Sequence, residues 1–199
     1  MENMAKGVKN FTNTVAIRGR LCYNILKRPA SGGFRCRSTT IPTGGTMEQV
    51  RFGVVGLGNM GSSHVNNLFG GKVPGAVLTA VCDIKPARLD WAKSVCGDAV
   101  SYFADYKEML ASGKIDAVMI ATPHYWHPII GMDAFDAGIH VLSEKPIGVY
   151  TKKVYEFMDK AQKSGLAFGI MYNQRTDKFY QKMREMVQNG ELGELKRCI

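Results

Sequence analysis

The sequence has no long apolar run and no paired cysteines. No stretch approaches the roughly 18 apolar residues that a membrane-spanning helix needs, so we expect no membrane partner. The five cysteines show neither disulfide-type nor metal-type spacing, and no secretory segment precedes them. A disulfide framework and a metal site are therefore not expected. These absences favour a cytoplasmic protein.

Acidic residues are scarce in the first part of the chain, which carries most of the net charge of +9. Residues 1–46 hold eight Lys or Arg against one acid, Glu2, and we expect a disordered basic tail. Two explanations remain open. The tail could be a presequence with a short amphipathic helix over residues 15–26, which implies the mitochondrial matrix, or translation could begin at Met47. The rest is nearly neutral, which argues against nucleic acid as a partner.

The most informative stretch follows this tail. An apolar run over residues 50–55 leads into Gly56, Gly58 and Gly61 with the spacing G-x-G-x-x-G, and a second apolar run ends in Asp83. A lone G-x-G-x-x-G is often only a flexible turn. Strand, glycine turn, helix, strand and acid in this order are typical of a dinucleotide-binding unit.

Each glycine of this loop has a physical role. Gly56 permits a tight turn, Gly58 lets a pyrophosphate approach the backbone, and Gly61 lets the helix pack closely on the strand. The unpaired N–H groups at the helix start would face the phosphates. The predicted cofactor contacts in the loop are Gly56, Leu57, Gly58, Asn59, Met60 and Gly61.

Asp83 predicts which dinucleotide binds. Its carboxylate would accept hydrogen bonds from the adenosine ribose hydroxyls, and its charge would repel a 2′-phosphate, which favours NAD over NADP. Lys85 and Arg88 lie just beyond Asp83 and could weaken this preference, so NADP remains possible.

Strand-like and helix-like runs alternate from residue 50 onward, which predicts an α/β fold with a doubly wound, mostly parallel sheet. We expect a dinucleotide-binding domain over residues 47–172 and the start of a truncated α/β second domain over residues 173–199. The expected strands cover 50–55, 76–82, 99–103, 117–121, 140–143, 166–172 and 194–199. The expected helices cover 60–69, 86–95, 106–111, 129–137, 151–163 (capped by Thr151) and 177–188.

Further motifs follow the later strands: Ala121-Thr122-Pro123 with His127, Glu144-Lys145-Pro146, Asn173-Gln174-Arg175 and a closing run over 189–195. Together with the glycine loop they resemble the Gfo/Idh/MocA family of nicotinamide-dependent sugar and inositol dehydrogenases. Many Rossmann proteins share the glycine motif, whereas Glu-Lys-Pro after the fifth strand is much more specific. The resemblance spans residues 50–199 and implies a Rossmann domain followed by an α/β domain.

The resemblance implies roles for residues at the carboxyl edge of the sheet. Lys145 matches the family's lysine beside the nicotinamide and the reacting hydroxyl, so it is our candidate for catalysis and for contacts with cofactor and substrate. Glu144 would hold Lys145 in place or touch the nicotinamide ribose. Thr122 and Pro123 end the fourth strand where the cofactor should pass, and we expect them to contact the ribose.

Several polar residues have two open interpretations. His127 could line the cofactor pocket or cap the following helix. Asn173 and Arg175 match a stretch that lies near the substrate or nicotinamide in relatives, although Arg175 could instead cap or pair with the next helix. We expect His64 and His140 to be packing or surface residues.

The activity that the resemblance implies is hydride transfer between NAD(P) and a secondary alcohol of a sugar, inositol or related polyol. The family's usual catalytic Asp/His or Tyr lies in the later domain and has no counterpart here, so we expect a fragment that could be inactive alone. The alternatives are an NAD-dependent glycoside hydrolase of the same family and a non-catalytic nucleotide-binding module. The full-length protein could be a homo-oligomer.

Overall fold

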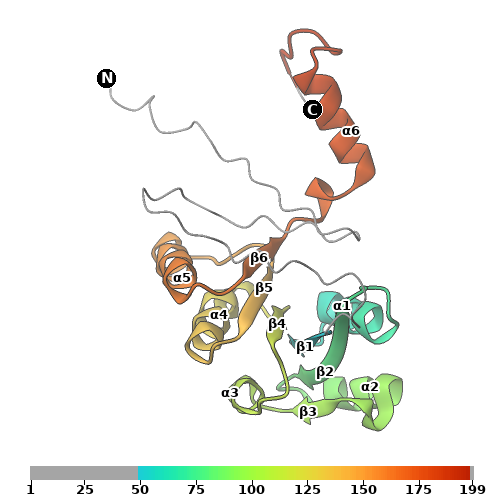
Figure 1. The fold of residues 1–199 in the computed structure, drawn as a ribbon, viewed down its shortest axis with the longest axis vertical. Coiled ribbons are helices and arrows are strands. Elements are labelled where there is room, and N and C mark those ends of the chain that lie inside the picture. Colours follow the sequence, from blue (N-terminus) through green and yellow to red (C-terminus); the bar gives the residue numbers. More distant parts are fainter. Residues whose placement is uncertain (1–48, 198–199) are drawn as a thin grey trace, which may run out of the picture.

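The computed structural model describes residues 49–197, which contain a six-stranded sheet with helices on both faces (Figure 1). The strand order is β3-β2-β1-β4-β5-β6, and every pairing is parallel. The predicted doubly wound α/β fold is confirmed. No helix in this part of the chain is long and apolar enough to cross a bilayer.

The strands are β1 (Val50–Val55), β2 (Ala76–Cys82), β3 (Ser101–Phe103), β4 (Ala117–Ile120), β5 (His140–Glu144) and β6 (Phe168–Met171). The α-helices are α1 (Asn59–Phe69), α2 (Pro86–Cys96), α3 (Tyr106–Ala111), α4 (His127–Asp136), α5 (Thr151–Ser164) and α6 (Lys178–Gln188). Short 3-10 helices are η1 (Gly97–Ala99), η2 (His124–Trp126) and η3 (Asn173–Arg175).

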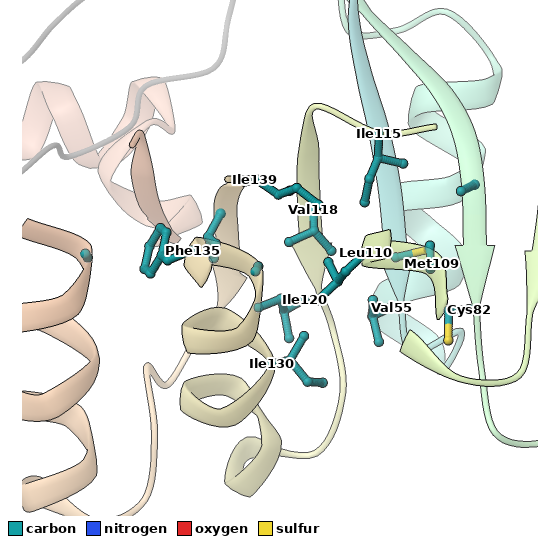
Figure 2. Packing of buried hydrophobic residues seen from close by; sticks show 14 of the residues in the cluster. Val55, Cys82, Met109, Leu110, Ile115, Val118, Ile120, Ile130, Phe135 and Ile139 are labelled. Carbon is teal, nitrogen blue, oxygen red and sulfur yellow. The ribbon is translucent and has the colours of Figure 1, made fainter. Parts of the chain in front are cut away.

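Alternate residues of the central strands enter two hydrophobic cores, because successive side chains of a strand point to opposite faces. Val55 and Ile120 belong to the core beneath α3, α4 and α5 (Figure 2). Val54 and Met119 belong to the core beneath α1 and α2. Burial on both faces explains why the central strands read as continuous apolar runs.

Several predicted boundaries need correction. β3 begins at Ser101 because the preceding residues form η1, and α4 begins at His127 rather than two residues later. Thr151 is the first residue of α5, and Tyr150 holds the cap position without a side-chain hydrogen bond. The predicted Thr151 cap is therefore wrong. Asp177 does cap α6, since its side chain accepts from the backbone of Phe179 and Tyr180.

The two ends of the chain limit what can be compared. The predicted strand over 194–199 does not form in residues 194–197, and its last two residues lie outside the described part. The basic tail over residues 1–46, its short helix and the alternative start at Met47 also lie outside it. α6 stands away from the layered sheet and helices (Figure 1).

The strand register brings the sequence motifs to one edge. Val55 pairs with Ile120, Ile120 pairs with Ser143, and Glu144 pairs with Met171. The segments that follow these strands therefore emerge at the same carboxyl edge. The connections diverge at β1 and β4, which is the topological switch point where α/β proteins bind ligands.

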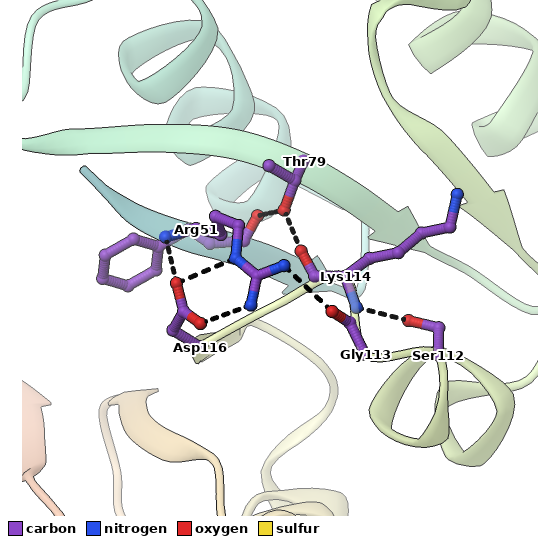
Figure 3. A network of polar contacts seen from close by, with 7 residues as sticks. Arg51, Thr79, Ser112, Gly113, Lys114 and Asp116 are labelled. Carbon is purple, nitrogen blue, oxygen red and sulfur yellow. Dashed lines mark hydrogen bonds and ion pairs between the residues drawn. The ribbon is translucent and has the colours of Figure 1, made fainter. Parts of the chain in front are cut away.

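A polar network fixes the opposite, amino-terminal edge (Figure 3). The Arg51 guanidinium donates to both carboxylate oxygens of Asp116, at 2.6 and 3.1 Å, and to the Gly113 carbonyl at 2.9 Å. The Arg51 backbone N–H also donates to Asp116 at 2.9 Å. These hydrogen bonds lower the pKa of Asp116. The network joins the start of β1 to the segment that leads into β4.

Candidate functional site

The glycine loop after β1 is too crowded for side chains at two positions. Gly56 has φ +88°, and a Cβ there would lie 2.8 Å from the Ala121 carbonyl group. A Cβ at Gly61 would lie 1.7 Å from the Gly56 oxygen. A Cβ at Gly58, in contrast, would meet nothing within 4 Å. The loop is therefore tightly packed against β4 and α1, with open space above Gly58.

The start of α1 is suited to an anion. Gly58 is its N-cap and provides no side-chain hydrogen bond, and the first turn carries no acidic residue. The Ser62 hydroxyl donates back to the Gly58 carbonyl at 2.7 Å, and the first N–H groups of an α-helix have no partner within the helix. These N–H groups and the positive end of the helix dipole favour a phosphate.

Asp83 lies directly against this loop. Its Oδ2 accepts from the Leu57 N–H at 2.7 Å, and its Oδ1 accepts from the Lys85 N–H at 2.8 Å. The Gly56 N–H donates to the Cys82 carbonyl at 2.8 Å, which draws the two strand ends together. Each carboxylate oxygen can accept a second hydrogen bond, so Asp83 retains capacity for ribose hydroxyls.

Thr122 contributes an unsatisfied group on the other side of the switch point. Its Oγ1 is buried and has no hydrogen-bond partner among the described residues. The Thr122 N lies 2.9 Å from where a Gly56 Cβ would be, so the hydroxyl belongs to a residue that borders the glycine loop. Pro123, the next residue, is exposed. A glycine cradle, a free helix start, an acid and a spare hydroxyl fit a dinucleotide.

His127 joins two loops. Its side chain is fully buried, Nε2 lies 2.8 Å from the Thr122 carbonyl oxygen, and Nδ1 lies 2.7 Å from the Pro146 carbonyl oxygen. Trp126, and not His127, holds the cap position of α4, whereas the expected contact between the His127 ring and a cofactor stays a prediction. His127 ties the end of β4 to the segment after β5.

Glu144 and Lys145 have contrasting environments. Glu144 is 4% exposed; its Oε1 lies 2.7 Å from His64 Nε2, and its Oε2 accepts from the Lys145 N–H at 3.1 Å. Burial opposes ionisation, but the hydrogen bond and charge of His64, with those of Lys145, outweigh it and lower the pKa of Glu144. The Lys145 side chain is exposed. Of the two predicted roles for Glu144, holding Lys145 matches this geometry.

His64, predicted from the sequence to be a packing or surface residue, makes a contact that this prediction missed. The residue is buried, but it is a hydrogen-bonded partner of Glu144 rather than packing alone. One signal was available: Gly61, His64, Val65 and Leu68 share the buried face of α1. A polar side chain on a buried face needs a partner.

Asn173 and Arg175 lie in η3, just past β6 at the same edge of the sheet, and both are exposed. The Arg175 guanidinium lies over the Tyr172 ring, 5.8 Å from its centroid, and Asp177 rather than Arg175 caps α6. Residues 49–197 contain no group of three or more His, Cys, Asp or Glu side chains that could hold a metal.

This fold and this edge define an NAD-binding Rossmann domain of the oxidoreductase type. A family model described as "Oxidoreductase family, NAD-binding Rossmann fold" matches residues 50–172. The chain belongs to this family, Gfo/Idh/MocA, as the sequence motifs predicted.

Individual relatives agree with this assignment. The chain is 31% identical to inositol 2-dehydrogenase of Corynebacterium glutamicum over 74% of its own length and 44% of that protein. It is 30% identical to glycosyl hydrolase family 109 protein 1 of a Shewanella species, covering 75% of this chain and 34% of that protein. The crystal structure of scyllo-inositol dehydrogenase from Lactobacillus casei, with bound NAD(H) and scyllo-inositol, matches with a TM-score of 0.69 and 35% identity, over 73% of this chain and 43% of that one. The chain thus spans less than half the length of each.

Proposed function

We propose that this chain forms the cofactor-binding part of an NAD-dependent dehydrogenase that oxidises a secondary alcohol of an inositol, sugar or related polyol. The observation that carries the proposal is the placement of Asp83 against the glycine loop, with Lys145 exposed at the same edge of the sheet. NAD supplies the hydride acceptor when bound. The inositol dehydrogenases among the relatives support the polyol class.

In this proposal the residues at the carboxyl edge of the sheet have separate roles in binding and catalysis. The glycine loop and the start of α1 bind the pyrophosphate, and Asp83 accepts from the adenosine ribose hydroxyls. Thr122 and Pro123 contact the nicotinamide ribose. The Lys145 ammonium, which has no ion-pair or hydrogen-bond partner among the described side chains, stabilises negative charge on the reacting hydroxyl.

The substrate is expected on the side of the edge where β5 and β6 end. Lys145 and Tyr172 follow paired strand residues, so Asn173 and Arg175 emerge next to the proposed catalytic lysine. We assign them to substrate binding for this reason. The second domain of the longer protein would begin about residue 173 and complete the pocket.

We also propose a cytoplasmic location and a homo-oligomer for the full-length protein. The two cysteines in the described part, Cys82 and Cys96, are free and buried, which suits a reducing compartment.

Titration of the chain with NADH and NADPH, followed by nicotinamide fluorescence, tests the cofactor site. NADH should bind more tightly than NADPH. Asp83→Ala should weaken the affinity for NADH by about tenfold, because one or two charge-assisted hydrogen bonds are lost. Asp90→Ala, at an exposed acid on α2, is the matched control and should leave affinity unchanged. A folded chain that binds neither nucleotide would contradict the proposal.

A glycoside hydrolase is the second candidate, favoured by the similarity to the Shewanella protein. Incubation of the longer protein, which includes the second domain, with NAD and a panel of inositols, sugars and glycosides separates the two. Accumulating NADH with a free polyol supports the dehydrogenase, whereas glycoside cleavage without accumulating NADH supports the hydrolase.

A further inference from the structure

His64 and Glu144 form a buried pair between the glycine-loop helix α1 and the end of β5. The contact of 2.7 Å joins residues 80 positions apart in sequence, and the two side chains are only 11% and 5% exposed. Removing such groups from water is costly, and apolar residues of similar volume often stabilise a core as well or better. Stability alone therefore does not account for the pair.

The pair acts on the backbone next to Lys145. Glu144 uses one oxygen for His64 and the other for the Lys145 N–H. On the far side of Lys145, His127 contacts the Pro146 carbonyl oxygen. The backbone is held on both sides, while the lysine side chain is exposed. Because the Cα–Cβ direction follows the backbone, these contacts set the direction in which the Lys145 side chain leaves the chain and so limit where its ammonium can reach.

We propose that His64 is a positioning residue for Lys145. By donating to Glu144, it orients the carboxylate that holds the Lys145 N–H, and so keeps the ammonium at the nicotinamide end of the cofactor. The inference rests on the proposed function, in which Lys145 lies beside the nicotinamide. It gives α1 a second role, since the helix that receives the phosphates at its start also supports the reacting end through His64.

The position of Lys145 has an electrostatic signature. The oxidised nicotinamide ring is a cation and the reduced ring is neutral, so a nearby ammonium weakens binding of NAD+ relative to NADH. The ratio of the two dissociation constants, Kd for NAD+ over Kd for NADH, therefore reports whether the ammonium is in place. A purely structural role of His64 in α1 would change both constants by the same factor and leave the ratio unchanged.

The test measures both constants for the 199-residue chain, NADH by its fluorescence and NAD+ by competition. Lys145→Met should lower the ratio by at least about threefold, the effect of one partly screened charge. His64→Phe, which keeps a ring but no donor, should lower it similarly, and the double variant should lower it no further. His64→Gln retains an N–H donor and should keep the wild-type ratio within about twofold.

Thermal unfolding shows whether each variant is folded. If His64→Phe does not fold, Glu144→Asp replaces it, because the shorter carboxylate cannot reach both His64 and the Lys145 N–H; it should lower the ratio in the same way. An unchanged ratio in the folded variant, with both constants shifted equally or not at all, overturns the inference, and so does an unchanged ratio in Lys145→Met. If the wild-type chain binds neither nucleotide, this result contradicts the proposed function instead. The two failures are therefore distinguishable.

Discussion

The three glycines of the loop after β1 differ in what surrounds them. Gly61 is required by packing, because its missing Cβ is the space that the Gly56 carbonyl occupies. Gly58 faces open space and has an ordinary φ of −69°, so the fold does not require it. In the proposed function, the pyrophosphate requires Gly58, because it approaches the backbone at this position.

Alanine at these two positions should therefore have opposite effects. Gly58→Ala should leave the melting temperature nearly unchanged. It should weaken the affinity for NADH by tenfold or more, since tenfold corresponds to about 1.4 kcal/mol of binding free energy. Gly61→Ala should lower the free energy of unfolding by about 1–3 kcal/mol, because α1 must move. Thermal denaturation and NADH titration of both variants check this; tight NADH binding by Gly58→Ala would contradict the assigned phosphate site.

Glu144 should make the stability of the chain depend on acid pH. Its pKa in the folded chain lies below the ordinary value of 4.5, so the ionised carboxylate contributes stability above that value, and this contribution is lost as pH falls through the folded pKa. The pKa of Asp116 is also lowered, so its ionised carboxylate stabilises the folded chain in the same pH direction. The side chains of Asp116 and Arg51 are 39% and 45% exposed, however, and solvent screens their interaction.

Urea unfolding between neutral and acid pH measures this dependence. Glu144→Gln should flatten the acid side of the stability curve more than Asp116→Asn does. A larger effect of Asp116→Asn would show that the exposed network, and not the buried pair, controls acid stability.

At the scale of elements, the positions of helices and strands were largely predictable, because the central strands are buried on both faces and the helices end at glycines. Two kinds of feature were not predictable. The 3-10 turns η1 and η2 shift the starts of β3 and α4, since local turn geometry leaves no periodic pattern. The contact of His64 with Glu144 depends on tertiary packing that periodicity in either segment does not encode.

The packing of α4 on α5 depends on one missing side chain. A Cβ at Gly131 would lie 2.2 Å from the Phe157 ring, and Phe157 is fully buried in the core that α4 and α5 share. Gly131→Ala should lower the free energy of unfolding by about 1–3 kcal/mol through overpacking, despite the better helix propensity of alanine.

Ile129→Ala, on the more exposed side of the same helix, is the control and should cost less than about 1 kcal/mol. Equilibrium denaturation of both variants checks the difference. A stabilised Gly131→Ala chain would mean that Phe157 can move aside without loss.

At the scale of the whole molecule, the candidate cofactor-binding residues lie at one edge of the sheet and the Arg51–Asp116 network lies at the other. The glycine loop, Asp83, Thr122 and Lys145 all follow strand ends at the carboxyl edge, whereas Arg51 and Asp116 hold the amino edge together. The sequence motifs predicted the first set because they follow recognisable strands. They did not predict that His127 and His64 would support the site from within the core.

Mapping the NADH-binding site by backbone amide NMR of the 199-residue chain tests most directly the central claim that NAD binds at the carboxyl edge of the sheet. The account predicts that the largest shift changes fall on the loop from Gly56 to Gly61, on Asp83, and on the residues after β4 and β5, with little change around Arg51 and Asp116. Shift changes centred on the amino edge, or on α6 alone, would contradict the assignment of the carboxyl edge as the NAD site.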